Sequence, residues 1–296
     1  MKTLKQSWQK NWVGYFFLTP WLIGLLGLSV IPMAASLYFS FTSYDMFSAP
    51  KWIGIENYIE MFQDGKWLNS VKVTLTYVFI GVPLQLGFAL GVAVLLNRGL
   101  RGLRIYRAIY YVPSLFGGSV AVALLWRQLF GGDGLLNGLL ATIGLEGKNW
   151  ISSPDTALYT LILLTVWQFG APMVIFLAGL KQVPIELYES SKIDGAGPIR
   201  QFFSITLPLI TPIIFFNLVM QIINAFQAFT PAYIVSGGSG GPIDSTLFYT
   251  LYLYQKGFTQ FQMGYASAMA WFLLICISFV TALVFVSSKK WVYYQE

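Results

Sequence analysis

The sequence predicts an all-α membrane protein with six transmembrane helices, and three observations support this prediction. Hydrophobic residues make up 56% of the 296 residues, charged residues only 10%, and the mean hydropathy is +0.64. Six apolar stretches each reach the roughly 20 residues that a helix needs to cross a bilayer core. Lipid offers backbone groups no hydrogen-bond partners, so these stretches should be helices. The chain is therefore expected to be a polytopic membrane protein.

The six predicted spans run along the whole chain and form one transmembrane domain over residues 1–296. The first span resembles a signal peptide because basic residues precede it, but its apolar run is longer than the about 7–15 residues of a signal-peptide core. We expect it to remain as a helix. The predicted spans are residues 13–41, 73–96, 105–130, 157–180, 207–229 and 264–286.

The positions of Lys and Arg predict the orientation, because these residues are retained on the cytoplasmic side of a membrane. With the N-terminus inside, the cytoplasmic segments hold 12 of the 18 basic residues. Six spans then return the C-terminus to the cytoplasm. The 12 residues are Lys2, Lys5, Lys10, Arg98, Arg101, Arg104, Arg107, Lys181, Lys192, Arg200, Lys289 and Lys290.

Three absences from the sequence exclude or disfavour other functions. The chain has no histidine, which removes histidine-based catalysis, proton relays through histidine and most zinc sites. The predicted spans contain no Asp or Glu, although ion-coupled transporters usually bury such groups to bind their ions. No glycine-rich run ends in Gly-Lys-Ser or Gly-Lys-Thr, so the chain is not expected to bind ATP through a P-loop.

A charged loop, residues 181–206, separates the fourth predicted span from the fifth. Pro184 suits the first turn of a helix, Glu189 lies toward its positive N-terminal half, and Lys192 lies toward its negative end. Gly195 is expected to end this helix in a left-handed conformation. Gly197 and Pro198 can begin a second short helix. The loop is therefore predicted to be two short helices about a turn, facing water.

The same loop resembles the signature of the permease subunits of binding-protein-dependent ABC importers. That signature reads E-A-A-x-x-D-G-A, five residues, then F-x-x-I-x-L-P-x-x-x-P. Only Ser190 and Ser191 depart from it, since the pattern has two alanines there, and both remain small. The matching positions are Glu189, Asp194, Gly195, Ala196, Phe202, Ile205, Leu207, Pro208 and Pro212.

The resemblance extends over nearly the whole chain to the first permease subunit of maltose, lactose and glycerol-phosphate importers. The supporting stretches are Leu37–Thr42, Gly54–Tyr58, Leu95–Arg98, Leu124–Arg127 and Gly264–Ala268. It implies a type I ABC importer permease fold and a transport subunit, not an enzyme, that moves a sugar or oligosaccharide across the bacterial cytoplasmic membrane.

The resemblance also implies the partners of the chain. These are a second related permease, two ATPase subunits that hold ATP and magnesium, and an external solute-binding protein; no cofactor is implied in the chain itself. In such importers the signature loop docks on the ATPase. Glu189 would contact the ATPase, and Asp194 and Gly195 would hold the turn. Ser190, Ser191 and Ala196 would complete the coupling surface.

Polar residues form a stripe on the fifth predicted span. Asn217, Gln221 and Asn224 stand at i, i+4 and i+7, so they share one helix face, and Gln227 lies near the outer end. Amides in hydrocarbon need partners. Either the stripe faces a water-accessible path and binds sugar hydroxyls, or it joins neighbouring helices by hydrogen bonds, as membrane helices often do.

Other features have more than one interpretation. Trp167 with Gln168, and Trp126 with Gln128, are candidate sugar contacts, although tryptophan also anchors helices at the membrane interface, which we favour. The glycine-rich stretch 236–242 is interpreted as a mobile external loop or as a contact for the binding protein. Cys276 is expected to be a packing residue.

Three alternatives to a sugar permease remain open at this point. The first is an ABC permease for another solute, the second is an ion-coupled secondary transporter or channel, and the third is a membrane enzyme. Nucleic acid is not an expected partner despite the net charge of +6, because the basic residues stand in short clusters beside predicted spans, where topology and anionic lipid explain them.

Overall fold

The structure is a computed structural model that describes residues 2–97 and 102–293. Helices dominate it, and the strands in the described residues are two pairs of residues in one small sheet. The all-α prediction is therefore confirmed. The chain groups into two compact units, which are described separately: the first comprises Met1–Gln63 and Tyr254–Leu273, and the second comprises Asp64–Leu253 and Leu274–Glu296.

The first unit begins with a long apolar helix. The segment Gly14–Ser40 has 27 residues and the hydropathy of a membrane span, and it comprises most of α1 (Lys2–Leu25), the π-helical turn η1 (Leu26–Val30) and α2 (Ile31–Ser40). Its apolar side chains are exposed, and Leu28 reaches 83%. Such a surface suits lipid or a partner helix rather than water.

A short antiparallel sheet follows, joined to α3 (Glu56–Gln63) by a buried amide. In this sheet β1 (Thr42–Ser43) pairs with β2 (Lys51–Trp52). The Asn57 side chain donates to the carbonyls of Ser40 and Thr42, both at 2.9 Å. Asp45, in the loop between the strands, accepts the backbone and hydroxyl hydrogens of Ser48 and the backbone N–H of Phe47, and these bonds lower its pKa. The unit is completed by η4 (Gln255–Thr259) and the start of α16 (Met263–Ser288).

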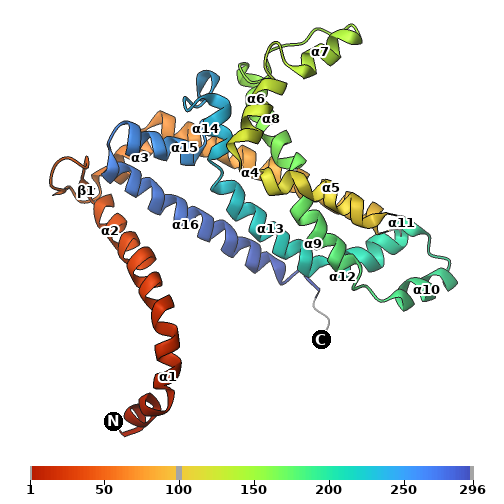
Figure 1. Ribbon diagram of the computed structural model, residues 1–296, viewed down its shortest axis with the longest axis horizontal. Helices are drawn as coiled ribbons and strands as arrows, with labels where there is room; N and C mark the ends of the chain where they lie inside the picture. Colours follow the sequence, from red (N-terminus) through yellow and green to blue (C-terminus); the bar gives the residue numbers. More distant parts are fainter. Residues whose placement is uncertain (1, 98–101, 294–296) are drawn as a thin grey trace. The chain divides into compact units, whose positions relative to one another are not determined.

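The second unit is built around α4 (Gly65–Leu96), which packs against α8 (Pro154–Trp167), α9 (Gly170–Leu180) and α13 (Thr211–Phe226) (Figure 1). This helix begins eight residues before the predicted span at Val73, because the Asp64 side chain caps it at Gly65. It accepts the backbone N–H groups of Lys66 at 2.9 Å and Trp67 at 3.4 Å. A carboxylate in this position satisfies otherwise unpaired amide groups of the first turn.

Three of the predicted continuous helices are broken. The third is α5 (Leu103–Phe116) and α6 (Val120–Leu129) with a 98° bend, and the fourth is α8 (Pro154–Trp167) and α9 (Gly170–Leu180) with a 41° bend. The fifth bends by 66° between α12 (Leu207–Leu209) and α13 (Thr211–Phe226). Pro208 and Pro212 lie on either side of the last of these bends, as proline often does at a kink. The first break lies at Gly117 and Gly118, where Ser119 caps α6.

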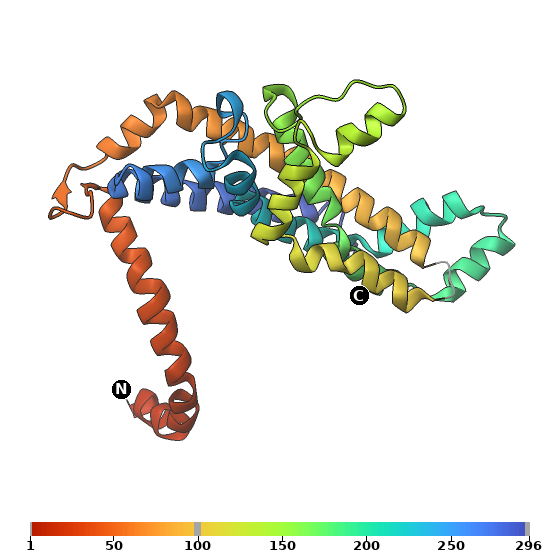
Figure 2. The same ribbon diagram turned by 45° about the horizontal axis from the view of Figure 1, so that its top comes forward.

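The remaining elements of the second unit are short. They are α7 (Leu135–Thr142), α14 (Thr230–Ser236), η3 (Pro242–Asp244) and α15 (Tyr249–Tyr254), and α14 packs against α6 (Figure 2). Residues 236–242, interpreted from the sequence as a mobile external loop or a contact for the binding protein, form hydrogen bonds with the residues that follow them. The carbonyl of Gly240 accepts both the backbone N–H and the hydroxyl of Thr246 at 2.9 Å. The Lys66 ammonium lies 3.4 Å from the Asp244 carboxylate.

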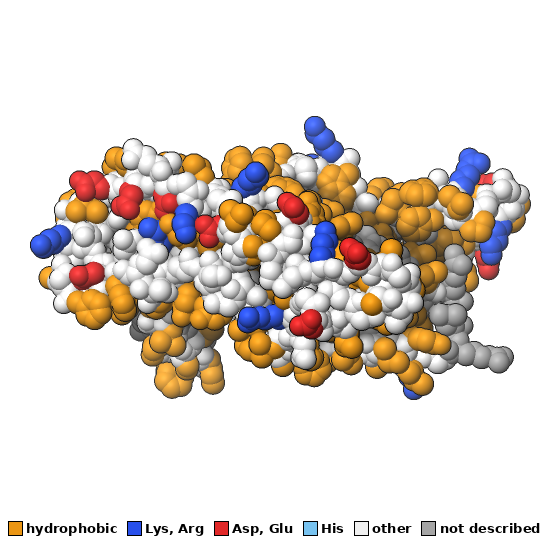
Figure 3. All heavy atoms as spheres, turned by 90° about the horizontal axis from the view of Figure 1, so that it is seen from above, with side chains coloured by type: hydrophobic (Ala, Val, Ile, Leu, Met, Phe, Trp, Pro, Cys, Tyr) orange, Lys and Arg blue, Asp and Glu red, His pale blue; other side chains and the backbone are white. Residues whose placement is uncertain are grey.

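Apolar side chains are widely exposed, as the orange surface in Figure 3 shows. Within the described residues, three helices are long and apolar enough to cross a membrane, and six segments qualify if each bent pair forms one span. The bent pairs are the third, fourth and fifth predicted spans. In a membrane protein such exposed apolar side chains are expected, because lipid covers this surface.

Candidate functional site

The charged loop folds into the predicted pair of short helices. The first, α10 (Ile185–Ile193), starts after Pro184 and ends at a turn in which Gly195 has φ of +77°. The second, α11 (Pro198–Gln201), continues through the π-helical turn η2 (Phe202–Thr206) into α12. We call residues 184–206 the coupling hairpin. Figures 1 and 2 show it projecting from the helices of the second unit.

The hairpin presents its charged residues to solvent. Glu189, Ser190, Asp194 and Gly195 are exposed, whereas Ser191 and Ala196 are half-buried. Within the part of the chain that the structure describes, neither Glu189 nor Asp194 makes a side-chain hydrogen bond or an ion pair. Their carboxylates therefore remain available to another molecule, and α10 buries none of its own side chains.

A second polar region lies inside the second unit, at the breaks of two bent helices. It is a cavity of about 220 Å³, which we call the amide cavity because four amide side chains line it. Those side chains come from α4, from the break between α8 and α9, and from α13. They are Gln85, Gln168, Gln221 and Asn224. Tyr77 and Thr165 add hydroxyl groups, whose oxygens lie 2.5 Å apart.

The breaks in the helices create this polarity. The Gln168 carbonyl lies at the end of α8. It accepts hydrogen bonds from the Ser114 hydroxyl at 2.8 Å and from the Gln85 side-chain amide at 3.2 Å. The Gln168 amide in turn donates to the Gly117 carbonyl at 2.8 Å. Because this side chain lies against the Cα of Gly117, a Cβ at that position would collide with it. A residue larger than glycine at this break would displace the Gln168 side chain from its present position.

Two amides of the cavity keep unused hydrogen-bonding capacity. Among the described residues, the side chains of Gln221 and Asn224 make no hydrogen bond, and Asn224 is exposed. The side-chain oxygen of Gln85 is buried without a partner, which normally costs about 1–3 kcal/mol. The described residues that line the cavity include no charged side chain.

The four residues of the predicted polar stripe separate in the structure. Gln221 and Asn224 line the amide cavity. Asn217, in contrast, is only 1% exposed and donates to the Ile213 carbonyl of its own helix at 3.2 Å. Gln227 follows the last turn of α13 and is exposed, away from the cavity lining.

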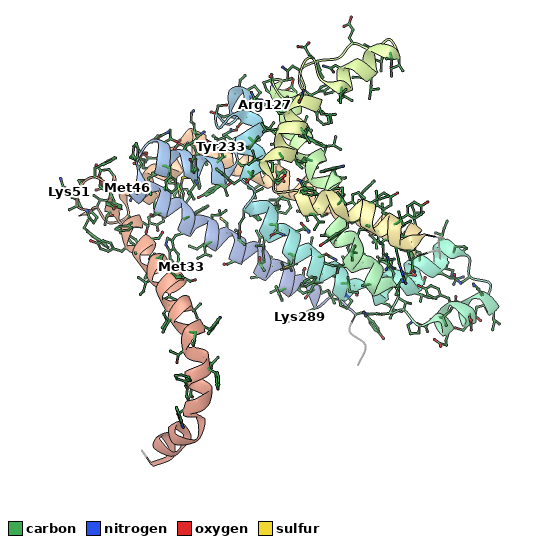
Figure 4. The ribbon with its side chains drawn as sticks, in the orientation of Figure 1. Met33, Met46, Lys51, Arg127, Tyr233 and Lys289 are labelled. Atoms are coloured by element: carbon green, nitrogen blue, oxygen red, sulfur yellow. The ribbon has the colours of Figure 1, made fainter. Side chains whose placement is uncertain are left out.

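The sequence analysis missed the contribution of α4 to the cavity. Tyr77 and Gln85 stand eight residues apart and so share one face of that helix. A glutamine in a long apolar segment is itself a signal, because polar groups within membrane helices need partners. Phe229, on which the Tyr233 ring of α14 stacks at 5.2 Å, also lines the cavity (Figure 4).

The tryptophan candidates lie at a different cavity. Trp126 of α6 is buried, its indole nitrogen donates to the Thr160 carbonyl at 2.9 Å, and its ring lies 5.9 Å from that of Trp167. Both rings line a largely apolar cavity of about 550 Å³ between α6 and α7. Trp126 is therefore a packing residue, and Arg127 beside it is exposed (Figure 4).

Known proteins resemble this chain over its whole length. The chain is 56% identical to "Probable ABC transporter permease protein YesP" of Bacillus subtilis over 298 residues, covering 100% of this chain and 96% of the relative. It is 31% identical to "sn-glycerol-3-phosphate transport system permease protein UgpA" of Yersinia pestis over 298 residues, covering 100% of both.

A solved structure shares the fold. A chain in the "Crystal structure of bacterial alginate ABC transporter in complex with alginate pentasaccharide-bound periplasmic protein" matches with a TM-score of 0.83 and 21% identity, covering 96% of both chains. This likeness supports the predicted importer permease fold with its six spans.

Residues 53–292 match the family described as "Binding-protein-dependent transport system inner membrane component". This match spans most of the chain and includes the coupling hairpin and the amide cavity. The chain therefore belongs to the binding-protein-dependent transport system inner membrane components and is an ABC transporter permease.

Proposed function

We propose that this permease carries a sugar or oligosaccharide through the amide cavity and that its coupling hairpin docks on a separate ATPase. The observation that carries the proposal is the chemistry of the cavity. Uncharged amides and hydroxyls converge there from three separate parts of the second unit. Amides both donate and accept hydrogen bonds, as sugar hydroxyls do. Charged groups would favour ions instead.

Gln221 and Asn224 are the proposed substrate contacts. Their side chains have no partner among the described residues, so a bound hydroxyl would replace water rather than break an internal bond. Gln168 and Gln85 complete the lining. Asn217 is proposed to stabilise its own helix, and Gln227 to lie outside the cavity. Two similar proteins, a glycerol-phosphate permease and an alginate transporter, support a solute with several hydroxyl groups.

The exposed face of α10 is the proposed ATPase contact. Glu189 and Asp194 have no internal partner among the described residues, so a basic surface on the ATPase can pair with them. Two ATPases need two such hairpins. The proposed assembly therefore contains a second related permease, two ATPase chains that bind ATP and magnesium, and an external solute-binding protein.

The proposed location is the bacterial cytoplasmic membrane, with both termini in the cytoplasm. The distribution of Lys and Arg supports this orientation, since 12 of the 18 lie in the segments assigned to the inside. It places the coupling hairpin on the same side as the ATP supply. The external loops, including residues 236–246, would face the solute-binding protein.

Uptake into cells that express the chain from its native operon tests the proposal. We expect uptake of at least one radiolabelled neutral oligosaccharide from a panel, with loss of uptake when ATP is depleted and retention when only the proton gradient is collapsed. Radiolabelled amino acids and inorganic phosphate serve as comparison solutes. Uptake that follows the proton gradient would contradict ATP coupling, and uptake of amino acids alone would contradict the solute class.

A further inference from the structure

The coupling hairpin contains a set of internal hydrogen bonds that join its two helices. Its charged residues face water, but Gln201 and Thr206 are buried, at 9% and 6% exposure. Both are polar, and both bond to α10. Polar side chains in so small and exposed an element could remain in water, so their burial and hydrogen bonding require an explanation.

Gln201 joins α11 to α10. Its side-chain amide donates to the Ser191 hydroxyl oxygen at 2.9 Å and to the Tyr188 carbonyl at 3.3 Å. The Ser191 hydroxyl donates to the same Tyr188 carbonyl at 2.9 Å. Ser191 stands where the family signature has alanine, so the departure from the signature supplies an acceptor that alanine lacks.

A second bond reaches further along the chain. The Tyr188 hydroxyl lies 2.7 Å from the Thr206 hydroxyl. Thr206 is the last residue of η2, which leads through α12 and the 66° bend after it into α13. Tyr188 therefore connects α10 to the helix that carries Gln221 and Asn224, and the bond bypasses the turn at residues 194–197.

The turn alone would transmit motion poorly. It contains Gly195 with φ of +77° and Gly197, and a Cβ at either position would meet nothing within 4 Å. Glycines with free space around them allow the backbone to change direction at little cost. Without another connection, a displacement of α10 would be absorbed in this turn.

We propose that Tyr188, Ser191, Gln201 and Thr206 form a brace that makes α10 and η2 move as one body. A displacement imposed on α10 then reaches α13 and changes the amide cavity. The inference rests on the proposed function, since it requires that a partner moves α10. The four are positioning residues, because none is expected to touch the ATPase or the solute.

The test follows a cysteine in the cavity and needs no knowledge of the solute. In a Cys276→Ser background, Asn224→Cys provides a single reactive thiol, since the chain has one natural cysteine. The complex is purified from native membranes. The rate of reaction with a membrane-impermeant maleimide is measured with and without magnesium ATP, and phosphate release is measured in the same samples.

We expect ATP to change the maleimide rate in the parent and Tyr188→Phe to remove most of that change while phosphate release continues. Loss of one hydrogen bond shifts an equilibrium by about three- to tenfold, and the response should fall by that factor. Gln201→Leu should act in the same direction. Thr206→Val should do so too, because the Thr206 hydroxyl bonds both to Tyr188 and, at 3.5 Å, to the Gln201 carbonyl.

Two controls separate coupling from folding. Ser204→Ala removes an exposed hydroxyl of η2 that takes part in none of the bonds of the brace, and the ATP response should persist. Thr206→Ser keeps the hydroxyl and should retain the ATP response. Thr206→Val removes the hydroxyl and should lose most of that response.

An unchanged ATP response in Tyr188→Phe and Gln201→Leu would overturn the brace while leaving the proposed function intact. Loss of the ATPase from these variants would also overturn it, because the residues would then shape the docking surface. A parent complex that contains no ATPase would overturn the proposed function, and the brace with it.

Discussion

The coupling hairpin and the amide cavity use polar residues in opposite ways. In the hairpin, the Gln201 amide donates to the Ser191 hydroxyl and the Thr206 hydroxyl bonds to that of Tyr188, while Glu189 and Asp194 face water without internal partners among the described residues. In the cavity, the neutral amides of Gln221 and Asn224 keep free capacity, and the described residues of the lining include no charge.

The difference follows from the surroundings of each region. A charge in water costs little to expose and can later attract a partner. Burying a charge within the membrane costs free energy, so an uncharged amide can bind a polar solute there at a lower cost. The exposed region therefore recognises its partner by charge, and the enclosed region recognises its solute by hydrogen bonds.

The largest effect is expected from a substitution that changes the turn of the coupling hairpin. Gly195→Val places a β-branched residue at φ of +77°, at a cost of about 1–2 kcal/mol, and the turn should change direction. We expect uptake of the parent's oligosaccharide to fall at least about tenfold. Gly197→Ala, two residues later with φ of −75°, is the matched control. Equal uptake in Gly195→Val would show that the turn geometry is dispensable.

The next largest effect is expected from a change in the cavity lining at Gly117. Gly117→Ala forces a methyl group against the Gln168 side chain, and such overpacking costs about 1–3 kcal/mol. Uptake should fall and the melting temperature of the purified chain should drop. Gly118→Ala meets nothing within 4 Å and should leave both unchanged. Identical behaviour of the two variants would contradict the close approach of Gln168 to Gly117.

A smaller effect sharpens the assignment of the solute contacts. Gln221→Leu and Asn224→Leu each remove one amide from the cavity, and each should raise the KM of uptake by about three- to tenfold. Gln227→Leu lies outside the cavity lining and should leave KM unchanged. Asn217→Ala should lower stability without raising KM, because its amide bonds to its own helix. An unchanged KM in both cavity variants would make them interhelical contacts instead.

The smallest effect tests the premise that exposed charges add little to the fold. Lys66 is 64% exposed and lies 3.4 Å from the Asp244 carboxylate. Lys66→Ala should change the free energy of unfolding by no more than about 1 kcal/mol. Lys72→Ala, which changes the other basic residue of α4, is the control. A larger loss in Lys66→Ala would show that this pair holds the loop at residues 236–246.

The sequence predicted the hairpin better than the cavity, for a physical reason. The hairpin is local: Pro184, Gly195 and Pro198 determine its ends by backbone chemistry within 20 residues. The cavity combines residues more than 130 positions apart, from Gln85 to Asn224. Helical periodicity placed Gln221 and Asn224 on one face with Asn217, but could not show which of them meets the cavity.

The broken helices were missed for a related reason. Hydropathy shows that a segment is apolar but not whether it is straight. Residues 105–130 were therefore predicted to form one helix. The bend of 98° between α5 and α6 depends on Gly117 and on the Gln168 side chain that fills the space beside it. That contact lies 51 residues away in the sequence.

Co-purification tests the central claim most directly, that the charged face of the hairpin recruits an ATPase. The tagged chain is solubilised from its native membrane as the parent, as Glu189→Lys and as Glu186→Lys, the last being a matched charge reversal in the first turn of α10. The account predicts an ATPase and a second permease with the parent and with Glu186→Lys. In Glu189→Lys the ATPase should fall at least about tenfold while the second permease remains. Recovery of the parent chain alone, or of equal ATPase with Glu189→Lys, would contradict the account.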